Sequence, residues 1–340
     1  MTRAACLWLL VLAACPARGP GAPPGQPSAH SAGCPTAANV HVASYLTQDG
    51  AARGGHTGWV LPLHDLKVEA LTAQPEYATL DATTAAALGV PPAPANAWLM
   101  VPGQAPCKLT IGSYYGAAVE APSPNVTYGV ELAGCAAPPA DQQQDAEALV
   151  VVSDQVPSGC QILPPQPVAA RLGETDAQKQ WQRPTKETAI PPVVARAIPP
   201  HDCRAPGCET LWAIAQVTVA GQPVAWAGAV NWLTIPPGAP PSTQCDWKAE
   251  TFAGFFVAGA DGTATRVTEG QDHPLLLTAV LADASGAKVL VAEGAGEYAT
   301  YDLSRGVATL ARHLVWLVLP AEAYAVDDHL GPSCPADERR

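Results

Sequence analysis

Charge is scarce in this chain, and positive charge most of all. Only 14% of the 340 residues are charged, with 18 Lys and Arg against 30 Asp and Glu, so the formal net charge is −12. A surface that binds nucleic acid needs clustered Lys or Arg to replace the counterions on phosphate. The sequence has no such cluster, and we therefore expect no nucleic-acid partner.

The motifs that mark common catalytic and metal sites are also missing. There is no Gly-x-Ser-x-Gly elbow, no His-Glu-x-x-His motif, no phosphate-binding Gly-Lys-Ser/Thr loop and no EF-hand ladder of acidic residues. Four histidines have an aspartate neighbour: His64-Asp65, His201-Asp202, Asp272-His273 and Asp328-His329. Neighbours in an extended strand point to opposite faces, so we expect turn or surface dipeptides there. The sequence thus predicts no catalytic motif, no metal site and no cofactor.

Long apolar segments are absent as well. Residues 4–12 (AACLWLLVL) and residues 313–320 (HLVWLVLP) are the strongest apolar runs. Both are far shorter than the roughly 20 residues that a helix needs to cross a bilayer. Because Arg3 precedes the first run, residues 1–14 have the form of an export signal.

The export signal ends at Leu12-Ala13-Ala14-Cys15. This order of Leu, two small residues and Cys resembles the lipobox of bacterial lipoproteins, and the resemblance implies that Cys15 becomes the acylated first residue of the mature chain. It covers only the first fifteen residues. Since Pro16 is not the Asp that retains many lipoproteins in the inner membrane, the resemblance favours the outer membrane, with the periplasmic or surface side left open. The alternative is an ordinary secretory signal cleaved near Ala14.

Cysteine usage agrees with export, because an oxidising compartment would let an even number of cysteines pair. Apart from Cys6 and Cys15, the disulfide candidates are Cys34, Cys107, Cys135, Cys160, Cys203, Cys208, Cys245 and Cys334. We predict a Cys203–Cys208 bridge across a tight loop. A second bridge, Cys107–Cys135, would join the ends of a two-strand unit. A zinc site that includes His201 is the alternative at Cys203 and Cys208, although no Cys-x-x-Cys occurs.

The distribution of Pro, Gly and alternating apolar residues predicts the fold class and the domains. We expect a mainly β protein with a few short helices, either sandwich-like or α+β, in two small disulfide-braced domains. The expected segments are a signal peptide at 1–14, a Pro/Gly/Ala-rich tether at 15–33, an N-terminal β-rich domain at 34–160, a Pro-rich connection at 161–200 and a C-terminal β-rich domain at 201–340.

Local patterns predict several individual elements. Strands are expected at 40–46, 98–101, 107–115 and 127–132, and Asp81 is expected to cap a helix at 82–88. In the second half, hairpins are expected around residues 259–262 and 284–286, and Ser304 is expected to cap a helix that continues through His313.

The clearest hairpin signal joins residues 211–219 to residues 224–235 through a turn at Gly221. Folding the strands about that turn places Val217 opposite Trp226 and Leu211 opposite Trp232. Both tryptophans then lie on an apolar face, which we expect to be the core side of the sheet. Trp212 would point the other way.

The remaining aromatic residues suggest a binding role. Trp212, Tyr114 and Tyr115 are candidates for stacking against a sugar ring, although they are too few to define a platform. We predict a lipid-anchored envelope protein that acts by binding or scaffolding, with the membrane and an envelope protein or glycan as partners. The alternative is a carbohydrate-binding, carbohydrate-active or other hydrolytic exported protein whose site is assembled outside known motifs. His64, Asp65, Asp272 and His273 would be the first residues to inspect for such a site.

Overall fold

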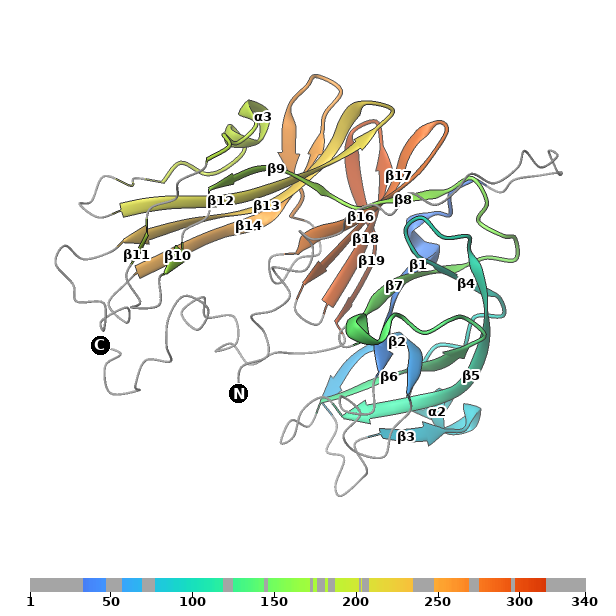
Figure 1. The fold of residues 1–340 in the computed structure, drawn as a ribbon. Helices are drawn as coiled ribbons and strands as arrows, with labels where there is room; N and C mark the ends of the chain where they lie inside the picture. The colour runs from blue at the N-terminus through green and yellow to red at the C-terminus, as the bar shows by residue number, and fades with distance from the viewer. Residues whose placement is uncertain are drawn as a thin grey trace, which may run out of the picture. The chain divides into compact units, whose positions relative to one another are not determined.

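Strands dominate the chain. The computed structural model describes residues 33–46, 57–68, 77–118, 125–143, 146–171, 174–175, 181–182, 187–201, 203, 208–234, 248–268, 275–294 and 297–315. Within them the helices are short, namely η1 (Ala37–Asn39), α2 (Ala82–Ala87), η2 (Ala140–Gln142) and α3 (Pro192–Ala195). The expected mainly β fold with a few short helices is confirmed (Figure 1).

The described residues divide into two compact units, and one interrupts the other in sequence. Residues 165–267 form one unit, and residues 30–164 together with 268–318 form the other. This division differs from the expected domains at 34–160 and 201–340, because the strands after residue 268 belong with the N-terminal strands. The expected connection at 161–200 also contains strands β8 (Gln161–Leu163) and β9 (Gln166–Arg171). Both are edge strands, where proline is tolerated.

Six strands of the larger unit close into a small barrel. They are β1 (Val40–Leu46), β2 (Gly58–Val68), β4 (Ala97–Met100), β5 (Cys107–Ala118), β6 (Asn125–Ala133) and β7 (Glu147–Val152). The sheet order β5-β4-β7-β1-β2-β6 is closed by pairing between β5 and β6, and β3 (Tyr77–Leu80) pairs with β5 at its other edge. Each of the strands expected in this region is confirmed, within a few residues at its ends.

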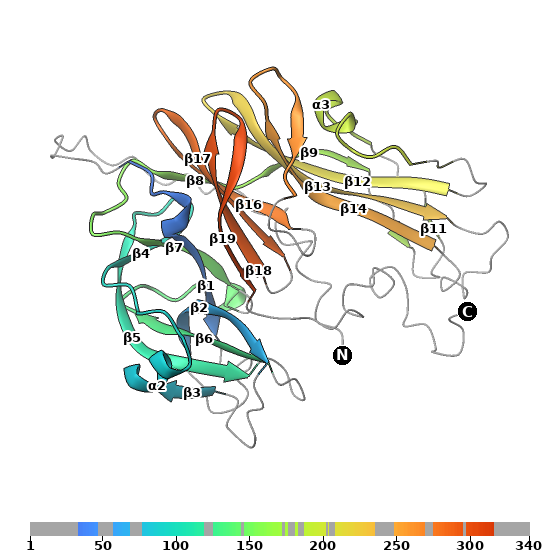
Figure 2. The same cartoon turned by 180° about the vertical axis from the view of Figure 1, so that it is seen from behind.

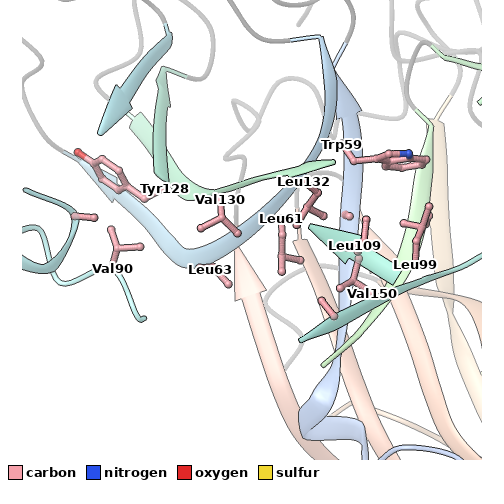
Figure 3. Close-up of a cluster of buried hydrophobic side chains, with 14 of the residues drawn as sticks. Trp59, Leu61, Leu63, Val90, Leu99, Leu109, Tyr128, Val130, Leu132 and Val150 are labelled. Carbon is pink, nitrogen blue, oxygen red and sulfur yellow. The ribbon is translucent and has the colours of Figure 1, made fainter. Parts of the chain in front are cut away.

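Apolar side chains fill the inside of this barrel. Trp59, Leu61, Leu99, Leu109 and Val130 are among the buried residues that face one another there (Figure 3). Helix α2 adds Ala85 to the same cluster. As expected, Asp81 caps this helix, with Oδ1 accepting a hydrogen bond from the Thr84 amide at 2.7 Å.

A second sheet completes the larger unit. Its order is β19-β18-β17-β16-β8, with β16 (Leu276–Asp283), β17 (Gly286–Gly294), β18 (Glu297–Ser304) and β19 (Val307–Val315). The hairpin expected near 284–286 joins β16 to β17. The helix expected from Ser304 to His313 is wrong. Arg305 and Gly306 adopt φ of 53° and 76° and form a two-residue turn between two paired strands.

The smaller unit is an open sheet of order β15-β14-β13-β12-β9. Its long strands are β12 (Cys208–Val219), β13 (Gln222–Thr234) and β14 (Lys248–Ala258), which lie side by side in Figures 1 and 2, and β15 (Ala264–Arg266) follows the hairpin expected at 259–262. A separate pair joins β10 (Glu174–Thr175) to β11 (Trp181–Gln182).

The β12–β13 hairpin is confirmed, but its expected register is wrong by one residue. The turn is Ala220-Gly221, both with positive φ, so Val219 pairs with Gln222. Trp226 therefore lies opposite Gln216, and Trp232 lies opposite Thr210. A slip of one residue exchanges the faces of a strand. Trp226 is buried and Trp232 packs beside it, as expected, but Trp212 shares their face and does not point the other way.

Candidate functional site

The tyrosines proposed from the sequence as ligand-stacking residues are structural. Tyr115 is buried and stacks on Tyr77 with ring centroids 5.5 Å apart. Tyr77 donates from its hydroxyl to Glu131 Oε1 at 2.8 Å, and burial raises the pKa of both tyrosines above the usual range, with the Glu131 hydrogen bond adding to the shift of the Tyr77 pKa. The Tyr114 hydroxyl accepts a hydrogen bond from the Ala93 amide at 2.7 Å. Tyr115 is thus not available to a ligand.

Trp212 lies in the smaller unit and is held by its own chain. Its indole nitrogen donates to the Thr188 carbonyl at 2.9 Å, and the Arg171 guanidinium lies 5.6 Å from the ring centroid. Arg171 is oriented by Glu209 through a 3.0 Å ion pair. The indole N–H is therefore engaged within the protein, and the ring already has a cationic neighbour.

Trp232 is the aromatic residue that the sequence reasoning missed. It is half-buried and lies diagonally across the ladder from Trp212 on the same face. The His201 ring stacks on it with centroids 4.5 Å apart. As expected, Trp232 lies on a core side of the sheet, where it packs against the buried cluster that includes Trp226 and Phe252. His201 packs against the Trp232 ring and Arg171 against the Trp212 ring. Both rings therefore already have partners within the protein.

The histidine–aspartate neighbours do not form a site in the described part of the chain. His64 lies on β2, whereas Asp272, His273, Asp328 and His329 lie outside the described residues. No group of three or more His, Cys, Asp or Glu side chains that could hold a metal ion occurs among the residues that the structure describes. None of the described helices has the length and apolar character to span a membrane.

Disulfides connect six of the eight candidate cysteines. The bridges are Cys34–Cys160, Cys107–Cys135 and Cys203–Cys208. The two predicted pairs are confirmed, and the zinc alternative at Cys203 and Cys208 is wrong because their sulfurs are bonded to each other. Cys245 and Cys334 lie outside the described residues. Disulfides of this kind indicate an oxidising, extracytoplasmic location.

The first described residues are fastened to the larger unit at several points. We call residues 34–41 the junction segment. Cys34 is bonded covalently to Cys160, with Cα atoms 4.8 Å apart. Ala37 is fully buried, its amide donates to Asp302 Oδ1 at 2.9 Å, and its carbonyl accepts from the Thr300 hydroxyl at 2.8 Å.

Two titratable side chains add to these contacts, one from β19 and one within the junction segment. Arg312 on β19 donates from Nη2 to the Ala38 carbonyl at 2.9 Å. His41 is buried, and its Nδ1 lies 3.5 Å from the Tyr298 hydroxyl. Burial lowers the pKa of His41 to about 3, and the Arg312 cation acts in the same direction. His41 is therefore neutral at physiological pH, which is the form that a buried site without a partner anion requires.

Three strand ends meet beside the junction segment and form a shallow, open depression. Strand β7 runs antiparallel to both β1 and β4, with Val151 opposite Val40 and Val152 opposite Ala97. The residues that follow β7 thus lie next to those that precede β1 and β4. The depression encloses about 510 Å³ and is lined by Asn39, Ala95, Asn96, Val152, Ser153, Asp154 and Gln155.

Hydrogen bonds within the depression set its side chains. Asn96 Nδ2 donates to Asp154 Oδ1 at 3.0 Å, and the Gln155 amide donates to the Ser153 hydroxyl at 3.1 Å. The Trp98 indole donates to the Ser153 carbonyl at 3.0 Å and supports this wall from β4. No sequence motif signals the group, because Asn39, Asn96 and Asp154 are each more than fifty residues from the next in the sequence. The arrangement offers donors and acceptors without a concentrated charge.

Comparison with known proteins adds no relative. No protein-family model, no curated protein and no solved structure matches the chain. Any function must therefore be argued from the chain's own residues.

Proposed function

We propose that this protein is a lipid-anchored protein of the bacterial cell envelope that acts by binding or scaffolding. Cys15 is the proposed lipid-attachment residue, residues 15–33 are the proposed tether, and the outer membrane is the proposed address. The lipobox-like Leu12-Ala13-Ala14-Cys15 supports lipid attachment. The three disulfides support export, since such bonds persist in oxidising compartments.

The observation that carries the proposal is the fastening of the junction segment. The first residues of a domain are poorly ordered unless something ties them down. Here the first described cysteine, Cys34, is bonded to Cys160, and side chains from β18 and β19 bind the next residues. A lipid tether would pull on this end of the fold, and a segment held only by strand pairing would fray first. The Cys34–Cys160 bond would transfer this pulling force to the body of the larger unit.

Substitution of Cys15 tests the anchor. The full chain, expressed in a bacterium with Cys15→Ala, should leave the membrane fraction and lose the acyl mass that the natural chain carries. Cys6→Ala is the matched control, because it removes a thiol from the proposed signal peptide and should change neither readout. An unlipidated natural chain in the soluble fraction would overturn the proposed address.

Carbohydrate binding is the second candidate function. It is favoured by the depression at Asn39, Asn96 and Asp154, where carboxamide and carboxylate groups converge beside strand ends. The aromatic residues first considered for this role are engaged elsewhere within the protein. The depression therefore carries this candidate function without them.

A further inference from the structure

We infer that the depression at the ends of β1, β4 and β7 binds a neutral saccharide. The inference deepens the proposed binding role by naming its site and ligand class, and it does not depend on the lipid anchor. It rests on the chemistry of the lining side chains, on the way the strands position them, and on the apolar residues among them.

The lining groups match the hydrogen bonding of a polyol. A sugar hydroxyl donates and accepts at once, and so does each carboxamide, with its NH₂ and its carbonyl oxygen. Asn39, Asn96 and Gln155 supply three carboxamides, and Ser153 supplies a hydroxyl. No Lys or Arg is among the described residues that line the depression, and Asp154 would repel an anion. An uncharged ligand rich in hydroxyl groups therefore fits best.

The backbone beneath the lining is well fixed. Asn96 directly precedes Ala97, Ser153 directly follows its pairing partner Val152, and the Ser153 amide donates to the Asn96 carbonyl at 3.3 Å. Asn39 belongs to η1, where Ala37 and Ala38 are bound by side chains of β18 and β19. Because these positions are set before a ligand arrives, little conformational entropy is lost on binding.

Apolar surface lies beside the polar groups. Ala95 and Val152 contribute apolar atoms to the lining. A sugar ring presents C–H groups as well as hydroxyls, so it would cover these apolar atoms while its hydroxyls reach the amides. Because the depression is open to solvent, it would hold a sugar by one face only, which agrees with weak binding.

A calcium ion is the rival occupant, because all of these side chains carry oxygen. Calcium takes six to eight oxygen ligands, and its stronger sites use several carboxylates. The lining contains one carboxylate, and its Oδ1 already accepts a hydrogen bond from Asn96. The observations thus favour the saccharide, and calcium becomes an outcome of the test.

Saturation-transfer NMR suits the weak affinity expected of a shallow site. The full chain carrying Cys15→Ala is titrated with maltotriose, cellotriose and the neutral N-acetylated chitotriose, and separately with CaCl₂. We expect transfer to at least one trisaccharide, and we expect Asn96→Ala/Asp154→Ala to weaken that binding at least about tenfold, since it removes a charged acceptor and a carboxamide. Asp141→Ala/Gln142→Ala is the matched control. It removes the same two chemical groups from exposed positions of the same unit and should leave binding unchanged.

Three results would overturn the inference. The first is the absence of transfer to all three trisaccharides. The second is unchanged transfer in Asn96→Ala/Asp154→Ala. The third is binding of Ca²⁺, but of no sugar, that this variant abolishes. Thermal unfolding of each variant shows whether a loss of binding comes from misfolding, and Asn39→Ala then provides an independent substitution in the same depression. Failure here leaves the membrane-fractionation result for Cys15 untouched, so the two proposals are tested separately.

Discussion

The two units of the chain reach a β fold by opposite routes. In the larger unit, Val40 pairs with Val151, so the barrel closes only when residues more than a hundred positions apart have met. In the smaller unit, β12, β13, β14 and β15 follow one another as hairpins. Contacts between distant residues cost more loop-closure entropy than local ones. We therefore expect the larger unit to depend more on covalent cross-links and on tight packing where its strands cross.

The distribution of disulfides follows this difference. In the larger unit, Cys34–Cys160 spans 126 positions and Cys107–Cys135 spans 28. The described bridge of the smaller unit, Cys203–Cys208, spans only five. The long bridge ties together the first and last parts of the barrel region, which the backbone alone leaves far apart in the unfolded chain. A short bridge restricts the unfolded chain much less.

The largest expected effect follows from removing the long bridge. Cys34→Ala/Cys160→Ala should lower the free energy of unfolding of the larger unit by roughly 4 kcal/mol, because the unfolded chain regains the freedom of a long loop. Cys203→Ala/Cys208→Ala should cost the smaller unit about 2 kcal/mol. Urea unfolding followed by hydrogen exchange, which reports each unit separately, measures both. Equal losses from the two variants would contradict the proposed difference between the units.

Close packing of strands gives the next effect. A Cβ on Gly129 would meet the Leu61 carbonyl oxygen and lie 2.9 Å from the Tyr115 ring, so Gly129→Ala should destabilise the larger unit by about 3 kcal/mol. In the smaller unit, a Cβ on Gly228 would lie 2.5 Å from both the Ala213 carbonyl oxygen and Ile214 Cδ1. We expect a smaller loss of about 2 kcal/mol there, because the backbone contact is less close than at Gly129 and the Ile214 side chain can move aside.

Gly33→Ala provides the control for both glycine variants, because the nearest atom to its Cβ would be Asp283 Oδ2 at 3.6 Å. It should leave unfolding unchanged. Hydrogen exchange should show that Gly129→Ala loosens only the larger unit and Gly228→Ala only the smaller one. Loosening of both units by either variant would mean that they unfold together, and the comparison would lose its basis.

Local features were predictable from the sequence, and distant ones were not. The N-cap at Asp81, the strand at 40–46 and the bridges Cys107–Cys135 and Cys203–Cys208 each follow from residues near one another or from a recognisable strand pair. The pairing of β7 with β1 and β4, which the barrel needs in order to close, and the return of β16–β19 to the N-terminal strands leave no local mark. Nor does the depression, because its side chains converge only through pairing of β7 with β1 and β4.

Two errors came from turns that allow more than one interpretation. Ala220-Gly221 and Arg305-Gly306 are both two-residue turns in which a residue other than glycine takes positive φ first. Such a first residue is uncommon. At Ala220, this conformation explains why the observed register of β12 and β13 differs from the expected one by one residue. At Arg305, it forms a turn between two strands where Ser304 is expected to cap a helix. At both turns, pairing between the flanking strands outweighs the preference of a residue other than glycine for negative φ.

The last of these effects, and the one specific to the junction segment, is pH dependence at His41. An unfolded histidine binds a proton below about pH 6.5, whereas folded His41, with a pKa of about 3, stays neutral. The unfolded state therefore binds more protons between these values, and stability falls as the pH falls. From about pH 7.5 to about pH 5, the free energy of unfolding of the larger unit should fall by roughly 2 kcal/mol for this reason.

Urea unfolding of the natural chain and of His41→Gln at both pH values isolates the contribution of His41, since only the natural chain should show it. In the smaller unit, no buried histidine occurs among the described residues, so its stability should change little over the same range. An equal pH dependence in His41→Gln would show that His41 is not the group responsible.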